Sequence, residues 1–249
     1  MLDDNVAGLI LWANAKVTEG QKAILREYQA RNIPIVFIDR FVDGIDTDYV
    51  GCDNFGGTYA LMHHLLELGH KDMVYLRHNI SNLYPIDERY RAFRTVLAEN
   101  NLDLHPVWKI NSPHHDDFVE TDIFQLLEDE DAAINKQIIS LIQNTTPKPS
   151  AIVCANDALA ILTIRAIRSI GLAVPADISV VGFDDISLAA YTEVPITTVT
   201  QDAHQIGKRA AEMLLERLDG DVSLPRHQSV PTRLQIRMST STPIVVKKT

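Results

Sequence analysis

The chain has 249 residues, 46% of them hydrophobic, which is enough for one large or two small globular domains with real cores. Its formal net charge of −10 argues against a nucleic-acid-binding face on this polypeptide, because such a face needs clustered Lys and Arg. No apolar run approaches the roughly 20 residues of a membrane span. Two acids precede the first apolar run, which is unlike a signal peptide. Two cysteines are too few for a disulfide framework. The composition therefore predicts a cytoplasmic protein with reduced thiols and no membrane partner.

Short runs rich in Val and Ile alternate with helical segments along most of the chain. The apolar runs predict strands at 6–11, 33–38, 49–52, 73–76, 151–154, 178–183 and 196–199. The helical periodicity predicts helices at 19–31, 55–68, 86–100, 121–143, 157–170 and 203–218. Continuous apolar strands are typical of parallel sheets covered on both faces, so this alternation predicts an α/β fold.

Individual residues mark where these helices begin and end. Asn54 and Asp157 are predicted N-caps, because short polar side chains satisfy the first free N–H groups of a helix. Gly69, Gly171 and Gly220 follow predicted helices, at the position where a left-handed residue commonly ends one.

Polar residues and one indole follow the predicted strands. In chain order they are Trp12, Asp39–Arg40, Asp53–Asn54, Arg77–His78, Asn156–Asp157 and Asp184–Asp185. Open α/β sheets bind ligands beyond the carboxyl ends of their strands. Carboxylates, guanidinium and amide groups bind hydroxyls, and an aromatic face covers C–H surface, so this set suits a hydroxyl-rich ligand. The alternative is that strand ends are polar only because loops are solvated and helices need caps.

Other kinds of site lack support in the sequence. Neither the dinucleotide-binding G-x-G-x-x-G, nor a P-loop, nor a G-x-S-x-G elbow occurs. The run of His and Asp at 114–117 lacks metal-ligand spacing, so no metal or cofactor is predicted. Asp184 and Asp185 would permit acid–base chemistry, but no nucleophile or metal accompanies them. The protein is therefore not expected to be an enzyme.

Three longer stretches resemble the LacI/GalR family of bacterial transcription regulators. They are YVGCDNFGGTYALMHHLLELGHKDMVYL (49–76), RYRAFRTVL (89–97) and PSAIVCANDALAILTIRAIRSIGLAVPADISVVGFDDISLAAYTEVPITTVTQD (149–202). The sequence departs from the family pattern at Ala92, where Gly is usual, and at Arg77–Asn79, where small residues and Gly-Pro are usual. Because that loop faces the ligand, the resemblance does not identify the effector.

The resemblance implies a periplasmic-binding-protein-like (type I) fold with two doubly wound parallel-sheet subdomains, joined by crossovers near 52–54, 200–202 and 219–222. The N-terminal subdomain would comprise 1–52 plus 203–220, and the C-terminal subdomain 53–200 plus 221–240. The chain starts at about the family's third strand. We therefore expect the helix-turn-helix head and about two βα units to be absent and the first subdomain to be incomplete.

The same resemblance implies the residues of the effector site and of the hinge. The implied effector-binding residues are Trp12, Asp39, Arg89, Asn156 and Asp184. Asp53 and Gln201 lie at predicted crossovers and are expected to serve the hinge rather than the ligand.

The resemblance implies an effector-sensing domain that binds a sugar or related small polar molecule and controls DNA binding through the missing head. It also implies a homodimer with the helix at 158–170 in its interface, unless that apolar helix is simply buried on its own sheet. Three alternatives stay open: a solute-binding receptor of a sugar importer, an enzyme acting on a sugar, and a chain whose exposed sheet edges leave it without activity.

Overall fold

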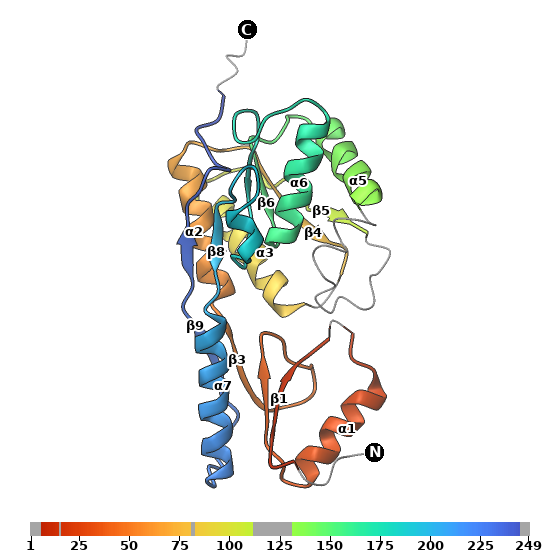
Figure 1. Ribbon diagram of the computed structural model, residues 1–249, viewed down its shortest axis with the longest axis vertical. Coiled ribbons are helices and arrows are strands. Elements are labelled where there is room, and N and C mark those ends of the chain that lie inside the picture. The colour runs from red at the N-terminus through yellow and green to blue at the C-terminus, as the bar shows by residue number, and fades with distance from the viewer. Residues whose placement is uncertain (1–5, 15, 81–82, 112–130, 245–249) are drawn as a thin grey trace.

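The computed structural model describes residues 6–14, 16–80, 83–111 and 131–244, and these form two lobes stacked along the long axis of the molecule (Figure 1). Each lobe contains a four-stranded parallel sheet. The strand orders are β1-β2-β3-β9 in the lower lobe and β5-β4-β6-β7 in the upper lobe, and a two-stranded sheet pairs β10 with β8. The predicted α/β fold with parallel sheets is therefore confirmed.

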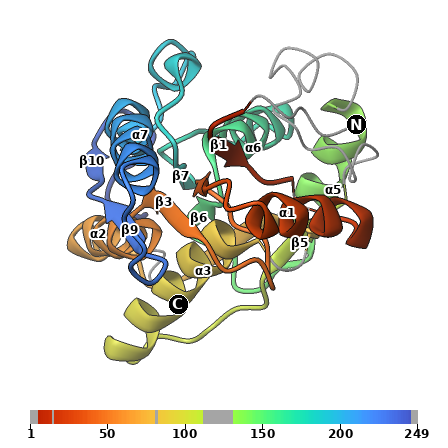
Figure 2. The ribbon, with the colours of Figure 1, turned by 90° about the horizontal axis from the view of Figure 1, so that it is seen from below.

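The lower lobe places one long helix on each face of its sheet. Its elements are β1 (Leu9–Trp12), α1 (Glu19–Ala30), β2 (Ile35–Ile38), β3 (Asp48–Cys52), α7 (Ala203–Leu218) and β9 (His227–Val230). Val36 and Val50 pack in one apolar cluster with Ile206 of α7, whereas Phe37 and Tyr49 pack in a second cluster with residues of α1. Successive strand residues point to opposite faces, so α1 and α7 lie on opposite sides of the sheet (Figure 2).

The upper lobe is doubly wound. Its elements are α2 (Asn54–Glu67), β4 (Met73–His78), α3 (Tyr84–Glu99), β5 (Trp108–Ile110), α5 (Asp131–Asn144), β6 (Ala151–Cys154), α6 (Asp157–Ser169), β7 (Ser179–Val181) and the 3-10 helix η1 (Ser187–Ala190). Helices α2 and α3 pack together, and α5 packs with α6. Strands β6 and β7 are fully buried and β4 is buried up to His78, and all three lie between these two layers, which explains their continuous apolar runs.

Three chain segments cross between the lobes. The first joins β3 to α2, the second joins β8 (Thr198–Thr200) to α7, and the third joins β9 to β10 (Arg233–Gln235) at Pro231–Thr232. The predicted third crossover near 219–222 is wrong, because β9 pairs with β3 from His227 to Val230 and so keeps 227–230 in the lower lobe rather than in the second subdomain. Ion pairs of Asp48 in β3 with Arg217 and Arg226 hold the segment between α7 and β9 beside β3.

Two predicted helix starts are displaced by one residue. The N-cap of α2 is Asp53, whose side chain accepts from the Gly56 N–H, and not Asn54. The N-cap of α6 is Asn156, and Asp157 is the first residue of that helix. The predicted helix ends are confirmed, with left-handed backbone at Gly69, Gly171 and Gly220.

The apolar residues of α6 are buried within their own lobe. Leu159, Leu162 and Ile167 are at most 1% exposed, so packing inside the chain accounts for the apolar composition that suggested a dimer interface. Both cysteines are buried and free.

Two expectations concern features that the described residues show only in part. The His and Asp run at 114–117 lies outside the described residues. Within the described part of the chain, no group of three His, Cys, Asp or Glu side chains is placed to hold a metal ion. Of the helices described, none has both the length and the apolar character to cross a membrane.

Candidate functional site

The upper-lobe half of the candidate site is built around Arg89, which projects from α3 and is only 4% exposed. Its Nε donates to Asn54 Oδ1 at 2.7 Å, and its Nη1 donates to the Ala155 carbonyl at 2.7 Å. Its Nη2 lies 3.0 Å from Asp184 Oδ1, and the guanidinium stacks 3.7 Å above the Phe183 ring. Bonds in three directions and a stacked ring fix this guanidinium, so Asp184 is held in one position.

Asp184 presents a partly open carboxylate at the end of the β7 strand. Its side chain is 28% exposed, and Gln201 of the second crossover donates to Oδ1. Burial raises the pKa of this carboxyl, and the charge of Arg89 counteracts part of that rise. The next residue, Asp185, accepts from Thr200 and from Arg237, so it ties the same loop to the crossover strands.

The lower-lobe half of the site is a cluster of Trp12, Asp39 and Arg40. The indole Nε1 of Trp12 donates to Asp39 Oδ2 at 3.1 Å, and the Arg40 guanidinium lies 4.5 Å above the indole ring. Arg40 Nε is 3.5 Å from the same carboxylate oxygen. The hydroxyl of Tyr49 donates to the Asp39 carbonyl at 2.9 Å, which fixes the backbone at the end of β2.

The three carboxylates of these clusters stand on strained backbone. Asp39, Asp184 and Asp185 have φ values of 59°, 110° and 53°. Left-handed backbone is uncommon for residues other than glycine and concentrates at ligand-binding and active sites. Strained backbone at three carboxylates therefore supports a binding role over the simpler explanation that strand ends are solvated.

The two halves face each other across the gap between the lobes. The charge of Asp39 contributes to the electrostatic environment of both Asp184 and Arg89. Beside them, the rings of Phe41 and Tyr84 meet across the gap with centroids 5.0 Å apart. A cavity of about 480 Å³ lies between the lobes, and its lining residues include Lys16, Lys22, Arg40–Asp43, Tyr84 and Asp87.

The structure brings together most, but not all, of the residues predicted for the site. Trp12 bonds to Asp39, and Arg89 and Gln201 both bond to Asp184. The remaining two act as helix caps. Asn156 accepts from the Leu159 N–H, and Asp53 caps α2 while its own N–H donates to the Val230 carbonyl at the third crossover.

Sequence reasoning missed the roles of Asn54, Arg40 and Tyr84. Asn54 was predicted as a cap and as one of the polar strand-end residues, but not as a partner of Arg89, to which it bonds while only 3% exposed. Arg40 and Asn54 both follow strands in the sequence, so the strand-end signal contained them. Tyr84 follows no strand and could not have been found in that way.

This set of side chains can bind a ligand without supplying an obvious reaction. Asp39 and Asp184 can accept from hydroxyls on opposite sides of the cleft, and Trp12 and Phe41 offer aromatic surface next to them. Among the described residues, no metal-ligating trio includes these carboxylates. The Cys52 thiol lies near Arg89, but burial raises its pKa to about 12, which disfavours the reactive thiolate.

Comparisons with known proteins agree with this picture. The family "Periplasmic binding protein-like domain" matches residues 62–240. The HTH-type transcriptional repressor PurR of Aliivibrio fischeri (strain MJ11) is 33% identical over 187 residues, which is 75% of this chain and 51% of that protein. The chain thus spans about half the length of this curated relative.

Two solved structures share the fold over nearly the whole chain. A LacI family transcriptional regulator from Enterococcus faecium with bound ribose has a TM-score of 0.74 at 22% identity, covering 96% of this chain and 81% of that one. The lac repressor dimer bound to operator and the anti-inducer ONPF has a TM-score of 0.72 at 27% identity, covering 95% of this chain and 74% of that one.

Proposed function

Because the chain belongs to the periplasmic-binding-protein-like domain family, among the LacI/GalR regulators, we propose that it is the effector-sensing unit of a transcription regulator. Its effector is a sugar or related polyol, bound between the lobes by Trp12, Asp39, Arg89, Asn156 and Asp184. The observation that carries this proposal is the pair of polar half-sites, one on each lobe, with Asp39 opposite Arg89 and Asp184. A regulator of this kind works in the cytoplasm.

The site also suggests how binding is passed on to the rest of the protein. Gln201 lies in a crossover and bonds to Asp184, so a ligand hydroxyl that takes over this bond changes the hinge directly. A ligand shifts the balance between open and closed arrangements only by its difference in affinity for the two. For sensors of this type that coupling is typically about 1–3 kcal/mol.

Several observations support a sugar over other small molecules. Carboxylates that face each other with an indole at one side suit the hydroxyls and C–H faces of a saccharide. The similar structures include one with ribose and a transcriptional regulator complexed with cellobiose. The relatives are regulators rather than importer receptors or enzymes, so we expect no hydrolysis across a panel of glycosides.

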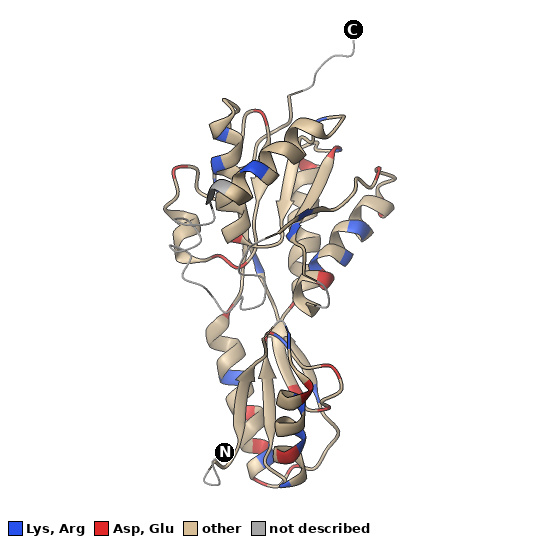
Figure 3. Ribbon diagram, turned by 90° about the vertical axis from the view of Figure 1, so that its right-hand side faces the viewer, with Lys and Arg blue, Asp and Glu red and all other residues tan. Residues whose placement is uncertain are grey.

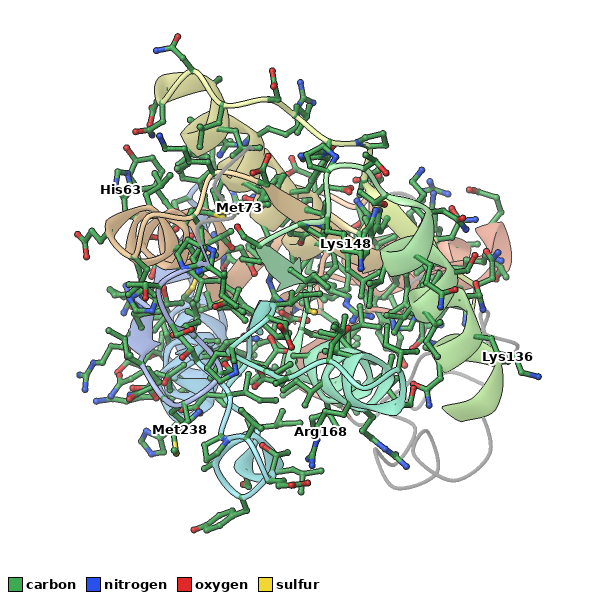
Figure 4. The ribbon with its side chains drawn as sticks, turned by 90° about the horizontal axis from the view of Figure 1, so that it is seen from above. His63, Met73, Lys136, Lys148, Arg168 and Met238 are labelled. Carbon is green, nitrogen blue, oxygen red and sulfur yellow. The ribbon has the colours of Figure 1, made fainter. Side chains whose placement is uncertain are left out.

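We further propose that the regulator is a homodimer and that it contacts DNA only through a segment outside this chain. Tyr191, Ile236 and Met238 are 85%, 61% and 67% exposed on the upper lobe and offer an apolar surface. Figure 4 shows Met238 on the outer rim of that lobe, near η1. Acidic and basic residues are interspersed over both lobes in Figure 3. We therefore expect no specific operator binding by this chain in a gel-shift assay.

Thermal unfolding against pentoses, hexoses, disaccharides and their phosphates tests the sensor function. A ligand at 100 times its Kd adds about 2.7 kcal/mol of stability, and each kcal/mol raises the Tm of a domain of this size by about 2–4 °C. The shift should disappear in Asp39→Asn and Asp184→Asn and persist in Asp103→Asn, a matched change at an exposed acid. A panel in which no sugar moves the Tm of the wild type contradicts the proposal.

A further inference from the structure

Asp157 is a fully buried acid that joins three elements of the upper lobe. It is 0% exposed at the start of α6. Its Oδ1 accepts from the Thr198 hydroxyl at 2.6 Å, and its Oδ2 accepts from the Ile186 N–H at 3.0 Å. Its own N–H donates to the Phe183 carbonyl at 2.8 Å. One side chain thus connects α6, the loop that carries Asp184, and the crossover strand β8.

The surroundings of Asp157 fit this carboxylate closely. A Cβ added at Gly182 would lie 2.1 Å from Asp157 Oδ1, so the chain entering the Asp184 loop passes directly against the carboxylate. An apolar side chain at 157 would leave the Ile186 N–H and the Thr198 hydroxyl buried without their acceptor, which is costly in a core. Backbone hydrogen bonds from Gly182 to Thr197 and from Asp184 to Val199 already join this loop to β8, and the Asp157 carboxylate adds a side-chain link that reaches further along the loop, to Ile186.

We propose that Asp157 is a positioning residue of the effector site, which holds the Asp184 loop against β8 so that movement at the ligand reaches the hinge. Asp157 touches no part of the cleft itself, and its effect on binding passes through Asp184 and Thr198. The expected effect on ligand affinity rests on the proposed sensor function, whereas the expected effect on the loop does not.

The charges around Asp157 add a dependence on pH. The charged groups that face it are Asp184 and Asp185 on the loop, and the Cys154 thiol faces it from β6. Arg89 and Arg237 pair with the two loop carboxylates. Burial, with a further contribution from Asp184, raises the pKa of Asp157 to about 7.

The sign of this dependence follows from proton linkage. The folded state holds a proton on Asp157 between roughly pH 4 and pH 7 that the unfolded state has lost, so stability falls as the pH rises through that window. Closure of the cleft removes water from Asp184 and strengthens its repulsion of an ionised Asp157. Ligand affinity should therefore also fall between pH 6 and pH 8, by about fivefold if binding raises the Asp157 pKa by one further unit.

Three variants separate positioning from mere structural support. Asp157→Asn has the shape of the protonated acid, and its amide can accept from Ile186 and donate to Thr198. Asp157→Ala removes both bonds, and Asp103→Asn is the matched control at an exposed acid. Hydrogen–deuterium exchange at 184–186 and 197–200 and urea unfolding between pH 5 and pH 8 need no ligand. D-ribose and cellobiose then serve as probes in thermal unfolding over the same pH range.

We expect Asp157→Ala to accelerate exchange at 184–186 and 197–200 more than elsewhere, and Asp157→Asn to keep the wild-type exchange pattern. The Asn variant should also lose the pH dependence of stability, and of sugar affinity, that the wild type and Asp103→Asn retain. Uniform acceleration across the chain, or an unchanged pH dependence in Asp157→Asn, overturns the proposal. The local exchange pattern without any sugar-induced Tm shift supports Asp157 as a positioning residue and counts against the sugar-sensing function alone.

Discussion

Replacing Arg89 with Met tests whether the upper half-site is a preorganised ion pair. Met keeps the apolar contact with Phe183 but removes the guanidinium and its three polar contacts. Removing one partner of a buried pair costs about 3–5 kcal/mol, because the other charge is left uncompensated. Each buried acceptor left unpaired, at Asn54 and Ala155, adds about 1–3 kcal/mol before relaxation. Since Asp184 is 28% exposed and can recruit water, we expect a net loss of about 4 kcal/mol near pH 8.

This loss should shrink in acid. Without Arg89, only the Gln201 hydrogen bond still opposes burial, so the pKa of Asp184 rises further and the carboxyl takes up a proton as the pH falls, which removes the buried charge. Urea denaturation of wild type, Arg89→Met, Asp184→Asn and the double variant at pH 5 and pH 8 measures both effects. In the double variant, Asn at 184 should restore part of the stability near pH 8. A loss below about 1 kcal/mol in Arg89→Met, or no rescue by the second change, would refute the ion-pair reasoning.

Three further predictions concern the framework around the site. Gly57→Ala should lower stability by about 1–3 kcal/mol in urea unfolding, because its Cβ would lie 2.8 Å from Val199 where α2 packs on β8. Gly207→Ala in α7, where a Cβ would meet nothing within 4 Å, should instead raise the Tm through a gain of about 0.5–1 kcal/mol. Burial alone would raise the pKa of Asp48, but hydrogen bonds, chiefly from Arg217, outweigh it and lower that pKa. Wild-type stability should therefore drop as the pH falls below about 4, and Asp48→Asn should flatten that drop in urea midpoints taken from pH 5 to pH 3.

The sequence predicted most of the strands because burial on both faces leaves continuous apolar runs. β9 reads HQSV and lies at the edge of its sheet with alternating exposure, so neither its composition nor its hydrophobicity separates it from a loop. β5 (WKI) and β10 (RLQ) have only three residues each, and a charged residue in each interrupts the apolar run. The misplaced third crossover follows from the missed β9, because without that strand the chain was predicted to leave the lower lobe near 219–222, although β9 keeps it there up to Val230.

The site was predictable as a set of strand ends but not as a set of contacts. Trp12 ends β1 and Asp39 follows β2, and these strands are neighbours, so their meeting follows once the strand order is known. The hydrogen bonds of Arg89 depend on where α3 lies against the sheet, and the local sequence around Arg89 does not determine that position. The left-handed backbone at Asp39 and Asp184 is equally invisible, because these residues adopt it only when tertiary contacts impose it.

Hydrogen bonds at the second crossover connect the carboxylates at the cleft to the strand that links the two lobes. Gln201 donates to Asp184 and Thr200 donates to Asp185, so the strand that links the lobes shares hydrogen bonds with the carboxylates at the cleft. A ligand hydroxyl on Asp184 must compete with Gln201, and the displaced amide then needs a new partner at the hinge. Under the proposed function, substitutions on this strand alter ligand affinity and hinge stability together, because one set of hydrogen bonds serves both. Under the same function, specificity can vary more freely at the lower half-site, where Trp12, Asp39 and Arg40 interact with one another.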